Sequence, residues 1–135
     1  MSFMLDTYVL LDILTADPAW LKWSTAQFRR ATADGLVPIN PIIYAELSAG
    51  FESRAELDHW LRPDLFRRLP LPFEAGFLAG RAFLAYRKAG GARTSPLPDF
   101  YIGAHAEFAG FTLVTRDAKR YRSYYPKLHL ISPED

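Results

Sequence analysis

The chain has 135 residues, half of them hydrophobic, and a formal net charge of +1. This length suits one domain with a buried core, and no apolar run is long enough to span a bilayer. The absence of cysteine excludes disulfides, thiol catalysis and thiolate metal sites. Residues 1–14 carry two aspartates and no basic start, unlike a signal peptide. We therefore expect a single domain over 1–135 that acts in the cytoplasm.

Short apolar segments alternate with helical segments in the first half of the chain. Helix starts are indicated by Asp17-Pro18, by Asn40-Pro41 and by a capping box from Ser53 to Glu56. The predicted elements, in chain order, are a strand that begins segment 2–14 and ends at Asp6, helix 19–34, strand 36–40, helix 41–50, helix 54–61 and a weaker strand within 64–71.

The second half repeats this alternation. Its predicted elements are the long helix 73–91, a loop over 92–98, helix 99–110, strand 111–115, helix 117–124 and strand 127–131. In the long helix, Phe73, Phe77, Arg81 and Leu84 sit at helical spacing, and Phe83 and Tyr86 widen the apolar face. Gly76 and Gly80 are expected to be close-packing contacts. Helices that alternate with apolar strands predict an α/β fold, with a parallel sheet covered by helices on both sides.

Four carboxylates fall where a parallel sheet binds its ligands. Asp6 ends the first strand, and Asp117 follows the strand in "FTLVTR". Glu46 lies on the helix after strand 36–40, and Asp99 opens the helix that leads into strand 111–115. Ligands of open α/β sheets bind beyond the carboxyl ends of the strands, so we expect these four side chains to converge at one edge.

A cluster of four carboxylates requires a cation, because like charges at close range raise one another's pKa and destabilise the fold. Carboxylate oxygens suit Mg²⁺ and Mn²⁺, which can polarise a phosphoryl oxygen and activate water. The cluster therefore predicts metal-assisted hydrolysis of a phosphodiester. Basic pairs such as Arg67-Arg68 and Lys119-Arg120 fit either a rim that attracts a polyanion or ordinary solvated faces.

Several segments, in this order, resemble a known family. They are "MLDTYVLLDIL", "YAELSAG", "LPDFYIGAHAEFAGFTLVTRD" and "KLHLISPED", and they are similar to PIN-domain proteins, specifically the VapC toxins of bacterial toxin–antitoxin pairs. The resemblance implies a three-layer α/β/α fold around a central parallel sheet of about five strands. It also implies a toxin that is a Mg²⁺- or Mn²⁺-dependent endoribonuclease, whose catalytic and metal-binding residues match Asp6, Glu46, Asp99 and Asp117.

The same resemblance implies further residues and partners. Thr115 matches a hydroxyl position that supports the site. The implied partners are an RNA substrate, a VapB-like antitoxin that carries the DNA-binding domain, and a second copy in a homodimer, with no membrane. The chain departs from the family at Tyr8. The family usually has asparagine at this position, two residues after the first aspartate, in the motif Asp-Thr-Asn. A second hypothesis is therefore a catalytically weakened PIN-like module that binds RNA or a partner without cutting.

Other polar and aromatic residues are assigned structural roles. We expect Asp12 to lie at the surface and His105 to be packed or partly exposed, not a catalytic base. Arg116 fits a phosphate contact or a solvated side chain equally well. The three tryptophans are expected in the core or at an interface and not as base-stacking platforms.

Overall fold

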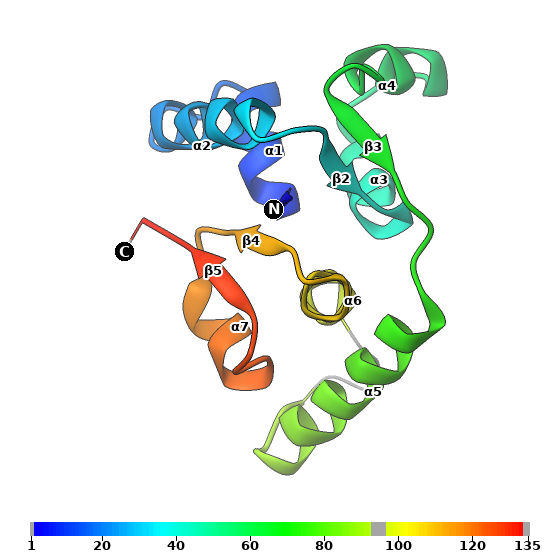
Figure 1. The fold of residues 1–135 in the computed structure, drawn as a ribbon, viewed down its shortest axis with the longest axis vertical. Helices are drawn as coiled ribbons and strands as arrows, with labels where there is room; N and C mark the ends of the chain where they lie inside the picture. Colours follow the sequence, from blue (N-terminus) through cyan, green and yellow to red (C-terminus); the bar gives the residue numbers. More distant parts are fainter. Residues whose placement is uncertain (1, 93–96, 134–135) are drawn as a thin grey trace.

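The computed structural model describes residues 2–92 and 97–133, and the helices and strands alternate along them as predicted. The elements are, in chain order, β1 (Phe3–Leu5), α1 (Thr7–Leu14), α2 (Leu21–Ala33), β2 (Val37–Ile39), α3 (Pro41–Ser48), α4 (Arg54–Trp60), β3 (Phe66–Arg68), α5 (Phe73–Lys88), α6 (Pro98–Ala109), β4 (Thr112–Val114), α7 (Ala118–Tyr124) and β5 (His129–Ile131). Helices lie on both sides of the strands (Figure 1), as a three-layer α/β/α fold requires.

The five strands are parallel, and their order across the molecule is β3-β2-β1-β4-β5. They form two hydrogen-bonded groups, β1-β4-β5 and β2-β3, although β2 lies beside β1. Val37 and Ile39 use their backbone groups toward β3, in bonds to Leu65 and Leu69. The backbone of Pro38, between them, is directed toward β1 instead, and proline has no N–H to donate to that strand. The expected sheet is thus present as two parts.

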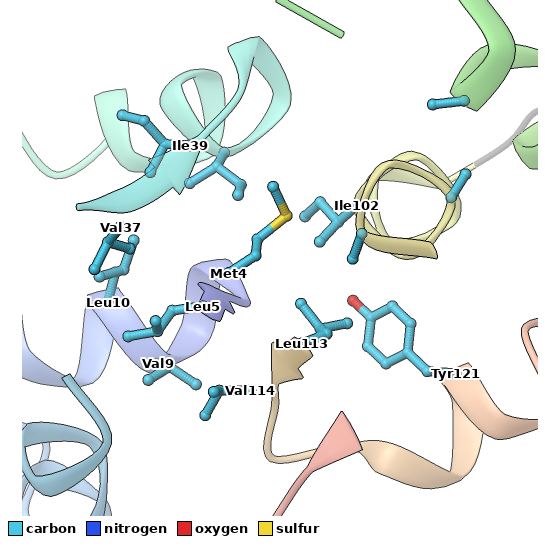
Figure 2. Close-up of a cluster of buried hydrophobic side chains, with 14 of the residues drawn as sticks. Met4, Leu5, Val9, Leu10, Val37, Ile39, Ile102, Leu113, Val114 and Tyr121 are labelled. Carbon is cyan, nitrogen blue, oxygen red and sulfur yellow. The ribbon is translucent and has the colours of Figure 1, made fainter. Parts of the chain in front are cut away.

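The core is formed by residues from both faces of the strands. Met4 and Leu5 are fully buried neighbours in β1, and their side chains point to opposite sides of the strand. Figure 2 shows Met4 directed toward Ile102 of α6, whereas Leu5 lies toward Val9 of α1. This burial on both faces explains why the strands read as continuous apolar runs in the sequence.

Two helix starts differ from the sequence prediction. A helix, α1, follows β1 directly, where only the strand was assigned, because Asp6 caps it through its side chain. The helix expected from Asp17-Pro18 begins instead at Leu21. Asp17 does accept bonds from the backbone N–H groups of Ala19 and Trp20, at 2.8 and 3.0 Å, but these bonds close a turn that precedes the helix.

The apolar face predicted for α5 is buried only in part: Phe83 and Tyr86 pack against the core, but three other residues of this face do not. Phe73 is 96% exposed and Phe77 is 63% exposed, and Leu84 is also exposed. The helix instead buries alanines at positions 75, 79 and 82 and packs against α6 (Figure 1). Small side chains allow two helices to approach closely, so this alanine stripe faces inward. An added Cβ at Gly76 or Gly80 would meet no neighbouring atom, so the expected close packing there is also absent.

Two smaller predictions complete the comparison with the sequence. Residues 93–96 of the predicted loop 92–98 lie outside the described residues, and Pro98 is already the first residue of α6. Within the described ranges, no helix combines the length and the hydropathy that a membrane crossing would need.

Candidate active site

The backbone places Asp6 at the carboxyl end of the central strands. Its N–H donates to the carbonyl of Val114 at 2.8 Å, which continues the pairing of β1 with β4 by one residue. The Asp6 carboxylate then caps α1, because Oδ1 accepts a hydrogen bond from the N–H of Thr7 at 2.8 Å. Asp6 is therefore fixed at both its main chain and its side chain.

The second oxygen of the Asp6 carboxylate faces α7 and the end of β4. Oδ2 accepts hydrogen bonds from Thr115 Oγ1 at 2.8 Å and from the Tyr121 hydroxyl at 3.2 Å. The pKa of Asp6 rises to about 6, chiefly because burial disfavours the charged form. The bond from Thr115 lowers this pKa, and the nearby charge of Asp99 raises it. Asp6 is a buried acid with its hydrogen bonds already made.

Glu46 reaches the same region from α3. Its Oε1 accepts a hydrogen bond from Thr7 Oγ1 at 2.7 Å, so Thr7 connects Asp6 through its N–H and Glu46 through its hydroxyl. Burial raises the pKa of Glu46 above its usual value, the Thr7 bond lowers it, and the charge of Asp99 adds to the rise. Asp99 therefore acts on both Asp6 and Glu46.

Asp99 and Asp117 share a single cation, Arg120. Asp99 lies in the first turn of α6 and forms an ion pair with Arg120 Nη1. Asp117 lies at the start of α7, where its side chain makes no capping bond, and its Oδ2 is 3.5 Å from Arg120 Nε. The Asp117 N–H donates to Thr115 Oγ1 at 3.0 Å. Thr115 therefore links Asp117 to Asp6.

The structure thus relates all four predicted acids to one another, through different contacts. Asp6, Glu46 and Asp99 interact electrostatically, and Asp117 joins them through Thr115 and Arg120. Among residues 2–92 and 97–133, no three acidic or histidine side chains are gathered tightly enough to form a ready-made metal cage. The donor set suits a hard divalent ion, because it is made of carboxylates that repel one another.

Tyr8 stands at the open side of this region. Together with Asp6, Thr115, Arg116 and Asp117, it lines a pocket of about 200 Å³. Arg116 is not simply solvated, since its guanidinium lies over the rings of Tyr8 and Trp20. The bulky side chain in place of the usual asparagine therefore forms part of the pocket wall.

The prediction that Asp12 lies at the surface was wrong. Asp12 is 2% exposed, because α1 turns it toward α2, where Ser24 Oγ donates to its Oδ2 at 2.7 Å. The same oxygen is 3.4 Å from Arg116 Nε. His105 is packed in the interior, as expected, with its Nδ1 3.0 Å from the amide nitrogen of Asn40.

Three partners of the acids were not identified from the sequence. They are Thr7, Arg120 and Tyr121. Sequence spacing could have predicted two of these contacts. Thr7 is next to Asp6, and Arg120 follows Asp117 by three residues in a helix, a spacing that brings side chains together. Tyr121 gives no such signal, because its contact with Asp6 depends on how α7 packs.

The chain belongs to the PIN-domain family, whose sequence profile matches residues 3–125. The fold is similar to the crystal structure of VapBC2 from Rickettsia felis bound to a promoter DNA fragment, with 20% identity, a TM-score of 0.72 and 98% of each chain covered. It is similar also to VapBC-1 from nontypeable Haemophilus influenzae, with 17% identity, a TM-score of 0.72 and both chains fully covered. FitAcB from Neisseria gonorrhoeae is 20% identical, with a TM-score of 0.68 over 98% of each chain. No protein of curated function matches the chain.

Proposed function

We propose that this PIN domain is a VapC-type toxin, a Mg²⁺- or Mn²⁺-dependent endoribonuclease that hydrolyses RNA phosphodiester bonds. PIN domains are generally nucleases, which supports hydrolysis of nucleic acid as the reaction class. The observation that carries the proposal is the set of contacts that joins the four acids. Thr7 bonds to both Asp6 and Glu46, Thr115 bonds to both Asp6 and Asp117, and Arg120 pairs with both Asp99 and Asp117. Carboxylates from three separate segments share one region, an arrangement that a hard cation stabilises.

The residues that would hold the ion are Asp6, Glu46, Asp99 and Asp117. A bound divalent ion supplies polarisation of a phosphoryl oxygen and a lower pKa for water. The chain itself contributes orientation: Thr115 and Tyr121 hold one oxygen of Asp6, and Thr7 holds Glu46. Outer hydrogen bonds of this kind fix the direction of ligating oxygens.

A groove beside the acids supports RNA as the substrate, because two of its lining residues are basic. The groove has a volume of about 490 Å³, and it combines Lys119 and Arg120 with Asp117 and with aromatic residues such as Tyr86 and Tyr124. Lysine and arginine side chains hold phosphates without reading base identity. A strand laid in this groove would pass its backbone directly beside Asp117.

The principal test compares the wild-type protein with an Asp6→Asn variant on a structured RNA in Mn²⁺. The wild type should cleave and leave 5′ phosphates, whereas Asp6→Asn should lose more than the roughly 100-fold typical of removing an outer hydrogen bond. Asp64→Asn is the matched control, because Asp64 is exposed and pairs with Arg62 away from the acids. Equal cleavage by wild type and Asp6→Asn would refute the assignment.

The proposed partners follow from the similar structures and from exposed surface. The similar structures include a toxin–antitoxin complex from Klebsiella pneumoniae, and two VapBC structures contain DNA. We accordingly propose a VapB-like antitoxin, through which DNA is reached, and a homodimer. The exposed Phe73 and Phe77 offer apolar area for such contacts. A solution mass near twice 15.3 kDa tests the homodimer.

The contact of Arg120 with Asp99 favours one alternative, a PIN-like module that binds RNA or a partner without cutting. In that case, the guanidinium would serve as the permanent cation of the acids. Calorimetric titration with Mn²⁺ separates the two functions. No metal binding together with no cleavage supports the binding module, whereas binding of the ion together with cleavage supports the nuclease.

A further inference from the structure

Tyr8 is exposed, although its neighbours along the chain are buried. It is 59% exposed, although its neighbour Thr7 is buried and hydrogen-bonded to Glu46. Its ring forms a wall of the pocket that contains Asp6 and Asp117. The core therefore does not require this aromatic side chain, and its position beside the acids calls for a ligand with a flat apolar face.

The ring is braced by a series of contacts. The Arg116 guanidinium lies 5.5 Å from the centre of the Tyr8 ring and 4.9 Å from that of Trp20. Arg116 Nε is in turn 3.4 Å from Asp12 Oδ2, and Asp12 is held by Ser24. A side chain that is already held in place loses little rotamer entropy when a ligand binds to it.

The pocket with Tyr8 and the larger groove have Asp117 as a common lining residue. The groove is also lined by Lys119 and Arg120. A strand whose phosphates follow Lys119 and Arg120 would bring its next nucleotide past Asp117 and toward Tyr8.

We propose that Tyr8 stacks a nucleobase of single-stranded RNA next to the phosphodiester that is cleaved. This inference rests on the proposed nuclease function. Unpaired bases stack on aromatic side chains, whereas bases within a duplex are already stacked on one another. Arg116, which lies over one face of the Tyr8 ring, adds a cation–π contact that holds the ring in place. The site therefore selects unpaired nucleotides, with tolerance for base identity.

The test measures binding without cleavage. Fluorescence anisotropy follows labelled six-nucleotide uridine RNAs, intact or with one abasic residue at each position in turn, with Asp6→Asn as the reference protein. Stacking contributes about 1–3 kcal/mol per base, so loss of the stacked base should weaken binding about 5- to 150-fold. Adding Tyr8→Ala should cause the same loss with intact RNA and no further loss with the critical abasic RNA.

Two further variants separate stacking from folding defects. Tyr8→Phe retains the ring and should keep the reference affinity within about twofold, because stacking uses the π face and not the hydroxyl. Phe108→Ala removes an exposed aromatic at the opposite end of α6 from Asp99 and should leave the affinity unchanged. Loss of binding in both would indicate a general structural effect and would count against the proposal.

The outcomes distinguish this inference from the proposed function. If adding Tyr8→Ala leaves the affinity unchanged, or weakens intact and all abasic RNAs equally, the inference is overturned, and Tyr8 is better explained as a contact for a protein partner. That result leaves the nuclease assignment intact, because cleavage by the wild type is measured separately. Conversely, absence of wild-type cleavage removes the proposed function whatever the binding data show.

Discussion

The inner and outer parts of the acidic site are built in different ways. The inner part is Asp6, whose carboxylate accepts three hydrogen bonds from Thr7, Thr115 and Tyr121 and is 5% exposed as a residue. The outer part is the pair Asp99 and Asp117, which share the half-exposed side chain of Arg120. The inner acid is positioned by uncharged donors, and the outer acids by a charge.

This difference matters for what each part can do. Uncharged donors fix a carboxylate without neutralising it, so Asp6 keeps its capacity to attract a cation. A flexible guanidinium neutralises its partners and can leave them at small cost, because exposed ion pairs contribute about 0–1 kcal/mol. The inner part is therefore preorganised, whereas the outer part is adjustable.

Among the variants that test the difference between the inner and outer acids, Thr115→Val should have the largest effect on cleavage. The substitution preserves shape but leaves Asp6 Oδ2 with only the Tyr121 bond, so cleavage should fall about 10- to 100-fold. Initial rates on one RNA measure this, and Thr115→Ser should restore most of the activity. Thr15→Val, at the far end of α1, serves as the control. An unchanged rate in Thr115→Val would mean that Asp6 needs no preorganisation.

A smaller effect is expected from Arg120→Gln at the outer acids. Removing the guanidinium frees Asp99 and Asp117, so Mn²⁺ should bind more tightly, by up to about fivefold for an exposed pair. Calorimetric titration measures this change, and Arg122→Gln on the same helix is the control. Weaker binding of Mn²⁺ by Arg120→Gln would contradict the idea that the arginine competes with the ion.

The smallest effect concerns the contribution of His105, on the buried face of α6, to stability. Burial lowers the pKa of His105, so the unfolded chain binds a proton that the folded chain excludes. The resulting stability is present above the usual histidine pKa of about 6.5 and is lost as the pH falls through it, by at most about 1.4 kcal/mol per pH unit.

Urea unfolding at pH 7.5 and pH 5.5 tests this linkage. The wild type should lose more stability between the two values than His105→Gln, in which an amide oxygen can still accept from Asn40. The difference between the two proteins isolates His105 from the acids that titrate in the same range. The same pH dependence in both would show that His105 is not the group responsible.

The positions of the acids were predictable because strand ends are visible in a sequence. Asp6 and Asp117 each follow a β-rich run, and parallel strands present such ends at one edge. The face of α5 was not predictable, since periodicity reveals a stripe but not the direction in which it points. Its exposed aromatic residues and its alanines are both apolar, so the sequence pattern does not separate them. The packing against α6 buries the alanines, and among the aromatic residues it engages Phe83 and Tyr86. The prediction that Asp12 is exposed was wrong for a similar reason, because its burial depends on contacts with Ser24 and Arg116, which lie in other segments of the chain.

The missing N–H of Pro38 has a consequence for the acids. Glu46 is carried by the helix that follows β2, whereas Asp6 follows β1, and the main-chain ladder is interrupted between these two strands. Glu46 and Asp6 are connected across this interruption by Thr7, which bonds to both of them. An ion bound by both carboxylates would connect the two groups of strands, so metal binding would also stabilise the folded domain as a whole.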